Sequence, residues 1–160
     1  MAVIAISNSR DAEALDFYTT YPDLGASAAG LMAAVYSEAN PLPPEVREAV
    51  RMRIALLNDC VVCKTARPMP ELGDAFYDNI ADFARRPDVY SPAQRAAMEF
   101  AELFARDHLA IGDDLFARLR EHFDERQVAA LTISAGYFVA FGRLTRVLLL
   151  DHACPLAPAA

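Results

Sequence analysis

The chain has 160 residues and a mass of 17.5 kDa, which is one domain of ordinary size with enough length to bury a core. Hydrophobic residues make up 54% and charged residues 23%, which excludes a disordered or fibrous chain. The formal charge of −7 repels phosphate backbones and anionic lipid, so we expect neither nucleic acid nor a membrane as a partner. Three cysteines are too few for a secreted disulfide scaffold, and the first residues resemble no targeting segment, so we expect a cytoplasmic protein.

Helical periodicity dominates the chain, and no run of residues alternates between apolar and polar as a half-buried strand would. In the first half we expect helices over about residues 12–19, 24–38, 44–57, 60–67 and 71–85. The third is the best marked, because Pro43 and Pro44 suit a first helical turn and an apolar stripe follows, formed by Val46, Val50, Ile54 and Leu57. Asp59 is expected to cap the next helix, and Pro68 to end it.

The second half of the chain predicts three more helices. Ser91 and Gln94 form a capping box that opens a helix to about residue 107, a second helix covers about 112–123, and Asp124 caps the last, which ends near residue 151. The uncharged part of that last helix has fifteen residues, fewer than the roughly twenty that span a bilayer, so we expect a buried core helix. Aromatic residues at helical spacing are expected in the core: Phe100, Phe104, Phe116, Phe123, Tyr137, Phe138 and Phe141.

These elements together predict the fold class and the domain organisation. We expect an all-α protein, a single-domain helical bundle of seven or eight helices over residues 1–154, followed by a C-terminal tail over residues 155–160. No internal repeat or linker divides the chain.

The most informative segment is the CxxC motif formed by Cys60 and Cys63, at the start of a predicted helix. Residues three apart on a first helical turn share a face, so the two sulfurs can join, and the exposed N–H groups there stabilise a thiolate. These are the requirements of a redox dithiol. Two alternatives stay open: two buried cysteines that act as small hydrophobic residues, or half of a zinc site completed by His152 and Cys154.

Glu48 is the second candidate. It lies twelve positions before Cys60, on the helix face that also carries Met52 and Ala55. The reversal of the chain after that helix can bring this face over the cysteines, where a carboxylate can take the proton of a thiol as a general base. The alternative is a solvated surface glutamate.

The residues around these candidates resemble the signature of the carboxymuconolactone decarboxylase / alkylhydroperoxidase D-like family. That signature has a glutamate twelve residues before a CxxC motif and a histidine four residues after the second cysteine. Here Glu48, Cys60 and Cys63 match the pattern, and Arg67 stands at the position of the histidine. The similarity covers most of residues 42–150, with the following segments at its centre: Leu42–Glu48, Arg51–Ala55 and Asn58–Cys63.

The resemblance implies an all-helical fold, assembly as a homotrimer or homohexamer, and a thiol-dependent peroxide reductase activity. It also implies that Cys63 attacks the peroxide, that Cys60 closes the disulfide and that Glu48 relays the proton. The family's decarboxylase branch generally does not depend on a cysteine pair, so the intact motif favours the redox branch. Independently, the small and apolar residues around the last helix predict an oligomer, because one small domain has few elements to bury such a helix.

Arg67 is the departure from the family pattern. If the helix that starts at Cys60 continues through residue 67, Arg67 shares a face with Cys63 and can lower the pKa of the Cys63 thiol. An arginine cannot shuttle a proton, because it stays charged at any accessible pH. The alternative is a solvated arginine at the end of a helix.

The remaining candidates carry less weight. We expect the scattered histidines His108, His122 and His152 at the surface, and Cys154 as a bystander thiol. No phosphate-binding loop or dinucleotide fingerprint occurs in the sequence, so we expect no cofactor.

The sequence therefore predicts a peroxidase of the alkylhydroperoxidase type, with Cys60, Cys63 and Glu48 as its catalytic residues. Its substrate would be a small-molecule peroxide and its partner a thiol reductant. A carbon–carbon lyase that acts on a small acidic lactone is one alternative. A non-enzymatic redox sensor is another.

Overall fold

The computed structural model describes residues 20–148, and within this range the protein contains helices and no strand. The all-α class predicted from the sequence is therefore confirmed. The α-helices are α2 (Pro22–Tyr36), α3 (Pro44–Leu57), α4 (Val61–Thr65), α5 (Gly73–Asp78), α6 (Pro92–Arg106), α7 (Asp113–Arg120) and α8 (Glu125–Val147). Three 3-10 helices join them: η1 (Pro70–Leu72), η2 (Ile80–Arg85) and η3 (His108–Ala110). The expected helix over residues 12–19 and the expected tail lie outside the described residues.

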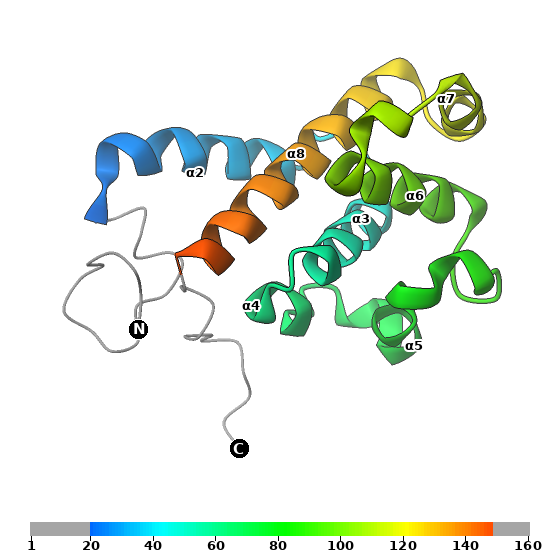
Figure 1. Cartoon of the computed structure of the whole chain (residues 1–160), viewed down its shortest axis with the longest axis horizontal. Helices are drawn as coiled ribbons and strands as arrows, with labels where there is room; N and C mark the ends of the chain where they lie inside the picture. The colour runs from blue at the N-terminus through cyan, green and yellow to red at the C-terminus, as the bar shows by residue number, and fades with distance from the viewer. Residues whose placement is uncertain (1–19, 149–160) are drawn as a thin grey trace.

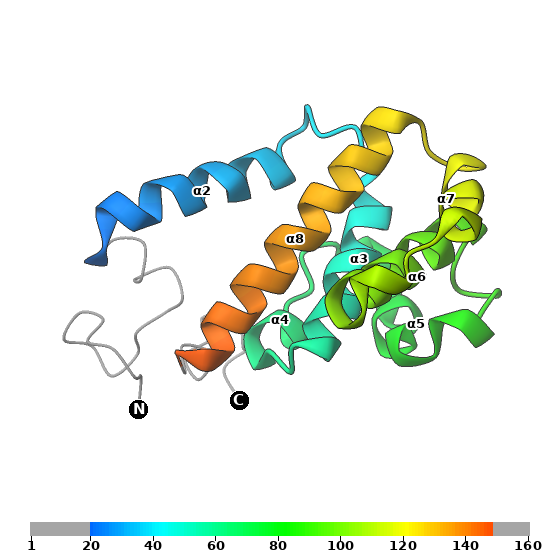
Figure 2. The same ribbon diagram turned by 45° about the horizontal axis from the view of Figure 1, so that its top comes forward.

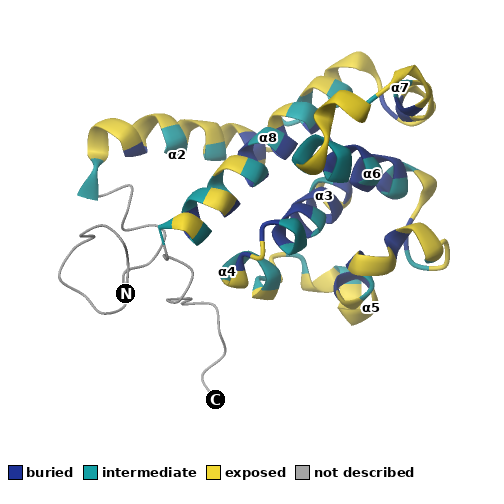
Figure 3. Cartoon of the chain, in the orientation of Figure 1, coloured by how far each residue is buried: buried dark blue, intermediate teal, exposed yellow. Residues whose placement is uncertain are grey.

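Helix α3 lies at the centre of the fold, where it packs most extensively against α6 and α8 (Figures 1 and 2). Val46, Val50 and Ile54 of its apolar stripe enter the main hydrophobic core together with α6, α7 and α8. The aromatic residues expected in the core are buried or half-buried there. Burial is concentrated on α3 and α6, whereas most of α2 is exposed (Figure 3). Helix α2 contacts α8, and its N-terminal end lies away from the other helices (Figure 2).

Three helix starts follow the local signals in the sequence. Pro44 occupies the first turn of α3. Ser91 and Gln94 form both bonds of a capping box at the start of α6, as predicted. Asp124 forms the equivalent box at the start of α8. By length and composition α8 could cross a membrane, but the core helix of a soluble protein meets the same criterion, and α8 packs here against α3 and α6.

The helix predicted over residues 71–85 is wrong as a single element. The chain forms η1, α5 and η2 instead, with non-helical backbone inside η2 at Asp82. Gly73, the first residue of α5 and the C-cap of η1, has φ of +76°, a left-handed conformation that glycine adopts without the steric cost of a Cβ. Phe76 and Tyr77 of α5 and Ile80 and Phe83 of η2 pack in a second hydrophobic cluster against α3. The break therefore lets side chains from both short elements reach the same cluster.

Candidate active site

The CxxC motif lies where the chain turns back from α3 into the short helix α4. Cys60 and Cys63 form a disulfide, with their Cα atoms 5.3 Å apart. Cys60 is the N-cap of α4, and its sulfur accepts a hydrogen bond from the backbone N–H of Cys63 at 3.3 Å. Asp59 is therefore not the cap: it has φ of +51° in the turn after α3 and forms an ion pair with Lys64. The pairing of the two sulfurs within one turn agrees with the geometry expected of a redox dithiol.

Glu48 is buried on α3 with 3% of its surface exposed, so the alternative of a solvated surface glutamate is wrong. Its carboxylate is held in a two-point ion pair with Arg51, in which Nε and Nη2 donate at 2.7 and 2.6 Å. Burial alone lowers the pKa of Arg51, but the hydrogen bonds and charge of Glu48 outweigh it and raise that pKa. The Arg51 guanidinium therefore stays charged inside the protein.

Arg51 also connects this ion pair to the CxxC motif. Its Nη1 donates to the carbonyl oxygen of Cys63 at 2.6 Å, and Nη2 donates to the carbonyl oxygen of Ala66 at 3.0 Å. Backbone carbonyls at the end of a helix lack helical partners and need such donors. One buried side chain on α3 thus satisfies the carboxylate of Glu48 and fixes the end of α4. This role of Arg51 was not predicted from the sequence, although Arg51 stands three residues after Glu48 and a helix places such residues side by side.

Arg67 does not have the position predicted for it. Helix α4 ends at Thr65, so no continuous helix carries Arg67 onto the face of Cys63. Arg67 is exposed, donates to the carbonyl oxygen of Lys64 at 2.6 Å and lies over the ring of Tyr77, with 4.4 Å to the ring centroid. The expected role of Arg67 beside the thiol is therefore overturned, and Arg51 is the arginine that contacts the CxxC motif.

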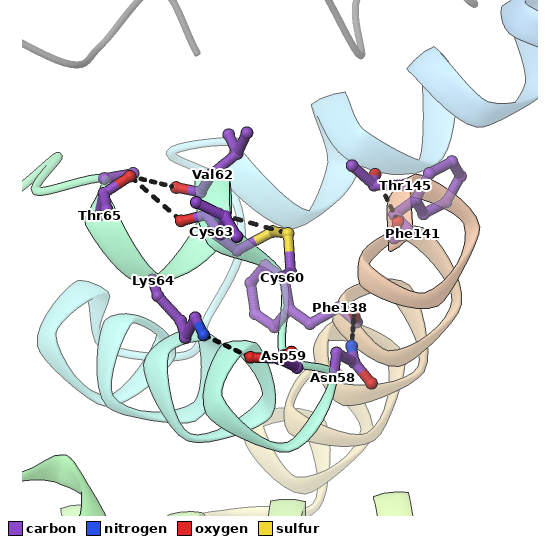
Figure 4. The surroundings of a disulfide bond; sticks show 12 residues. Asn58, Asp59, Cys60, Val62, Cys63, Lys64, Thr65, Phe138, Phe141 and Thr145 are labelled. Atoms are coloured by element: carbon purple, nitrogen blue, oxygen red, sulfur yellow. Dashed lines mark hydrogen bonds and ion pairs between the residues drawn. A yellow bond between two sulfur atoms is a disulfide. The ribbon is translucent and has the colours of Figure 1, made fainter. Parts of the chain in front are cut away.

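Cys63 lines a pocket of about 210 Å³ enclosed by α2, α3, α4 and α8. The pocket walls are mainly apolar and aromatic, and they consist of Met32, Tyr36, Arg51, Ala55, Asn58, Val62, Cys63, Ala66, Tyr137, Phe138, Phe141, Gly142 and Thr145. Figure 4 shows the disulfide on α4 facing α8, with Phe141 and Thr145 across from it. Cys60 is fully buried and does not line the pocket, whereas Cys63 is partly exposed. A small molecule in the pocket therefore meets Cys63 and not Cys60.

Asn58 holds the CxxC motif against the pocket wall on α8. Its side-chain amide donates to the carbonyl oxygen of Phe138 at 3.0 Å and accepts from Nε of Arg143 at 3.3 Å (Figure 4 shows the first bond). A Cβ atom at Gly142 would overlap the Asn58 side chain, so this close approach requires glycine. The aromatic residues of α8 were expected only in the core. Three of them, Tyr137, Phe138 and Phe141, also face the pocket, which helical periodicity alone does not reveal.

Two tyrosines lie near the buried ion pair. Burial and the charge of Glu48 raise the pKa of Tyr77, whose hydroxyl also donates to the carbonyl oxygen of Met69 at 3.0 Å. Burial raises the pKa of Tyr36 as well, and the charges of Arg51, Glu48 and Arg47 act on it. Of the two tyrosines, Tyr36 lines the pocket. Both therefore remain protonated at neutral pH.

The other predicted candidates lie away from this site. His108 and His122 are exposed, as expected, while His152 and Cys154 lie outside the described residues. Among residues 20–148 no group of three or more His, Cys, Asp or Glu side chains is placed to hold a metal ion. The zinc alternative would require residues beyond this range.

No family model matches the chain, but two curated proteins are similar to it. It is 28% identical over 116 residues to the uncharacterized protein YdfG of Bacillus subtilis. The matched region covers 69% of this chain and 78% of YdfG. It is 31% identical over 101 residues to the uncharacterized protein YnjA of Escherichia coli, which covers 61% of this chain and 55% of YnjA. The chain thus spans about half the length of YnjA.

Solved structures show what fold this is. A protein of unknown function from Agrobacterium tumefaciens, provisionally described as the antioxidant defence protein AhpD, superposes with a TM-score of 0.77 at 18% identity, over 88% of this chain and 97% of that one. An uncharacterized peroxidase-related protein from Silicibacter sp. gives 0.75 at 16% identity, over 84% of this chain and 73% of that one. A peroxidase-related protein with an AhpD core from Ralstonia eutropha gives 0.69 at 19%, with the same coverages.

At these identities the likeness establishes the fold and not the activity. The chain has the helical AhpD-like fold. The resemblance found in the sequence is confirmed at this level.

Proposed function

We propose that this protein is a thiol-dependent peroxide reductase of the alkylhydroperoxidase type. The observation that carries the proposal is the Cys60–Cys63 pair, closed as a disulfide, with Cys63 at the wall of an apolar pocket. Disulfides in reducing compartments are usually transient and catalytic, so a cytoplasmic location, which we also propose, is consistent with a cycling dithiol.

Cys63 is the attacking thiolate in this proposal. Glu48 acts as the base that receives the thiol proton, and the Cys63 sulfur attacks the outer oxygen of the peroxide. An S–O bond forms, the O–O bond breaks, and Cys63 becomes a sulfenic acid while the other oxygen leaves as an alcohol or as water. The thiol of Cys60 then attacks the Cys63 sulfur, water leaves and the disulfide closes. The partial exposure of Cys63 and the burial of Cys60 support this order.

The cycle needs an external reductant that supplies two thiols. Because Cys60 is fully buried, an incoming thiolate would attack the sulfur of Cys63 and release Cys60. A second thiol then breaks the mixed disulfide and restores the dithiol. The reducing partner is therefore a thiol compound or protein that can reach the pocket.

The pocket favours a peroxidase over a lyase that binds an acidic lactone. Among the described residues that line it, Arg51 is the one cation, and each of its three side-chain nitrogens already donates to Glu48 or to a backbone carbonyl. An anionic substrate would have to compete with these bonds. A peroxide needs a thiol to attack it and no cation to bind it, and a pocket with Cys63 among mainly apolar residues supports that chemistry.

We also propose that the protein is a homotrimer or homohexamer. Large apolar side chains are exposed on α2 and α8, including Leu24, Leu31, Ile133 and Val147. Contiguous exposed apolar surface commonly marks an interface. Light scattering should give three or six times 17.5 kDa, and a monomer mass at micromolar concentration would contradict this part of the proposal.

Turnover with an organic hydroperoxide and dithiothreitol tests the activity. The wild-type protein should consume many equivalents of peroxide per chain, Cys63→Ser should consume none above background, and Cys154→Ser should match the wild type. One equivalent consumed without turnover would support the redox sensor instead. If the wild type consumes none, the peroxidase proposal fails.

A further inference from the structure

The proposed reaction needs a proton at the leaving oxygen as well as a base at the thiol. Departure of an alkoxide or hydroxide is slow unless a positioned acid protonates it as the O–O bond breaks. Arg67 stands where the family pattern has a histidine, and it is exposed and stacked on Tyr77. Arg51 lines the pocket but cannot give up a proton to the leaving oxygen, because a guanidinium stays charged at any accessible pH. The acid must therefore come from another side chain of the pocket.

Most polar side chains of the pocket already have bonds that hold them in place. The Asn58 amide donates to the carbonyl oxygen of Phe138, and the Thr145 hydroxyl donates to that of Phe141 at 2.7 Å. Tyr36, in contrast, forms no hydrogen bond within residues 20–148. Its ring is fixed edge-on against Tyr137 and Phe138, with centroids 6.3 and 6.2 Å apart. Tyr36 thus lines the same pocket as Cys63, with its ring held in place and its hydroxyl unbonded within residues 20–148.

We propose that Tyr36 is the proton donor to the oxygen that leaves when Cys63 attacks a peroxide. This inference rests on the proposed peroxidase function. The Cys63 sulfur bonds to the outer oxygen, the O–O bond breaks, and the inner oxygen takes the Tyr36 proton to leave as an alcohol or water. The resulting phenolate recovers a proton from water, which reaches it because 45% of the Tyr36 residue is exposed. The thiol proton accepted by Glu48 returns to solvent, so the protons balance.

The chemistry of a phenol suits this task. An alkoxide or hydroxide is a far stronger base than a phenolate, so the proton transfer is downhill. The side chains packed around its ring partly desolvate Tyr36 and raise its pKa, which keeps the hydroxyl protonated before each reaction. The positive charges of Arg51 and Arg47 act in the opposite direction and stabilise the phenolate once it forms, and the Arg47 guanidinium lies 5.5 Å from the centre of the ring. The Tyr36 hydroxyl can therefore act here as the general acid that protonates the leaving oxygen.

The test compares two oxidants with different leaving groups. Cumene hydroperoxide releases an alkoxide that needs a proton, whereas peracetic acid releases acetate, a weak base that needs none. Pre-reduced protein is mixed with each oxidant, and loss of the Cys63 thiol in a single turnover is followed by quenching and labelling. In Tyr36→Phe the rate with cumene hydroperoxide should fall by about 10²-fold, as loss of a general acid does, while the rate with peracetic acid stays within about twofold.

Other outcomes separate the possible failures. A fall of equal size with both oxidants would mean that Tyr36 only shapes the pocket, and would overturn the assignment. No fall with either would do the same, as would a selective fall in Tyr137→Phe in place of Tyr36→Phe. Tyr21→Phe, which removes a hydroxyl just before α2 and outside the pocket, is the matched control. If wild-type Cys63 reacts with neither oxidant, the peroxidase proposal itself fails.

Discussion

Two arginines of α3, Arg51 and Arg53, lie two positions apart and so point to different sides of the helix. Arg51 pairs with Glu48 on its own helix and holds the carbonyls of Cys63 and Ala66. Arg53 pairs with Glu102 of α6 at 2.7 Å. It also reaches the carbonyls of η2 and stacks over Phe83 at 5.1 Å from its ring centroid.

The difference shows that one side of α3 supports the CxxC motif, whereas another side connects α3 to neighbouring helices. The bonds of Arg51 join Glu48 on α3 to the backbone of the CxxC segment at Cys63 and Ala66, so its loss should alter the chemistry as well as the stability. The bonds of Arg53 join α3 to α6 and η2, far along the chain from the cysteines. Its loss should alter stability alone.

Removal of Arg51 should have the largest effect on the free energy of unfolding. Arg51→Met leaves the buried Glu48 carboxylate without its partner, which should lower the free energy of unfolding by about 3–5 kcal/mol in urea denaturation. The double variant Glu48→Gln/Arg51→Met removes both charges and should recover most of that loss. If the double variant is as unstable as the single one, the buried charge is not the cause.

The same substitution should also slow the oxidation of the Cys63 thiol by peroxide. Without Arg51 the carbonyls at the end of α4 lose their donor, so Cys63 is held less well and its oxidation by peroxide should slow by about tenfold. The rate is measured at a temperature where the variant is folded, as shown by circular dichroism. An unchanged rate in folded Arg51→Met would mean that the arginine serves stability only.

Removal of Arg53 should have a smaller effect, and it should change only the stability of the fold. Glu102 keeps 25% of its side-chain surface exposed, so water can solvate it when Arg53 is lost. Arg53→Met should therefore lower the free energy of unfolding by about 1–3 kcal/mol and leave the Cys63 oxidation rate unchanged. A slower thiol in this variant would contradict the division between the two sides of α3.

The smallest effect is expected at Arg67. Its guanidinium is exposed and stacked on Tyr77, an arrangement that contributes about 0.5–1 kcal/mol. Because it lies beyond the end of α4, Arg67→Met should leave the pH dependence of Cys63 alkylation unchanged. A shift in the apparent pKa of that thiol would restore the role that the sequence first suggested for Arg67.

The sequence predicts best where a helix is defined by its own residues. Ser91 with Gln94 and Asp124 with Gln127 cap α6 and α8 through bonds within one turn, and local pattern is enough to find them. The candidate residues Cys60, Cys63 and Glu48 were likewise found from their spacing and from the family resemblance.

The prediction fails where distant parts of the chain decide the local structure. The end of α4 is fixed by Arg51, fifteen residues before Ala66, so no pattern within α4 reports that it stops before Arg67. The pocket is built by side chains from α2 and α8 around the CxxC motif, and Tyr36 joins it through tertiary packing alone. These long-range contacts leave no periodic trace in the sequence.

The central claim is that peroxide oxidises Cys60 and Cys63 to a disulfide that a thiol reductant reopens. Free thiols counted by alkylation and intact mass, before and after one equivalent of peroxide, test it most directly. The account predicts that two thiols per chain are lost, that Cys154 remains labelled, and that dithiothreitol restores all three. If all three cysteines stay labelled after peroxide, the redox function of this site is contradicted.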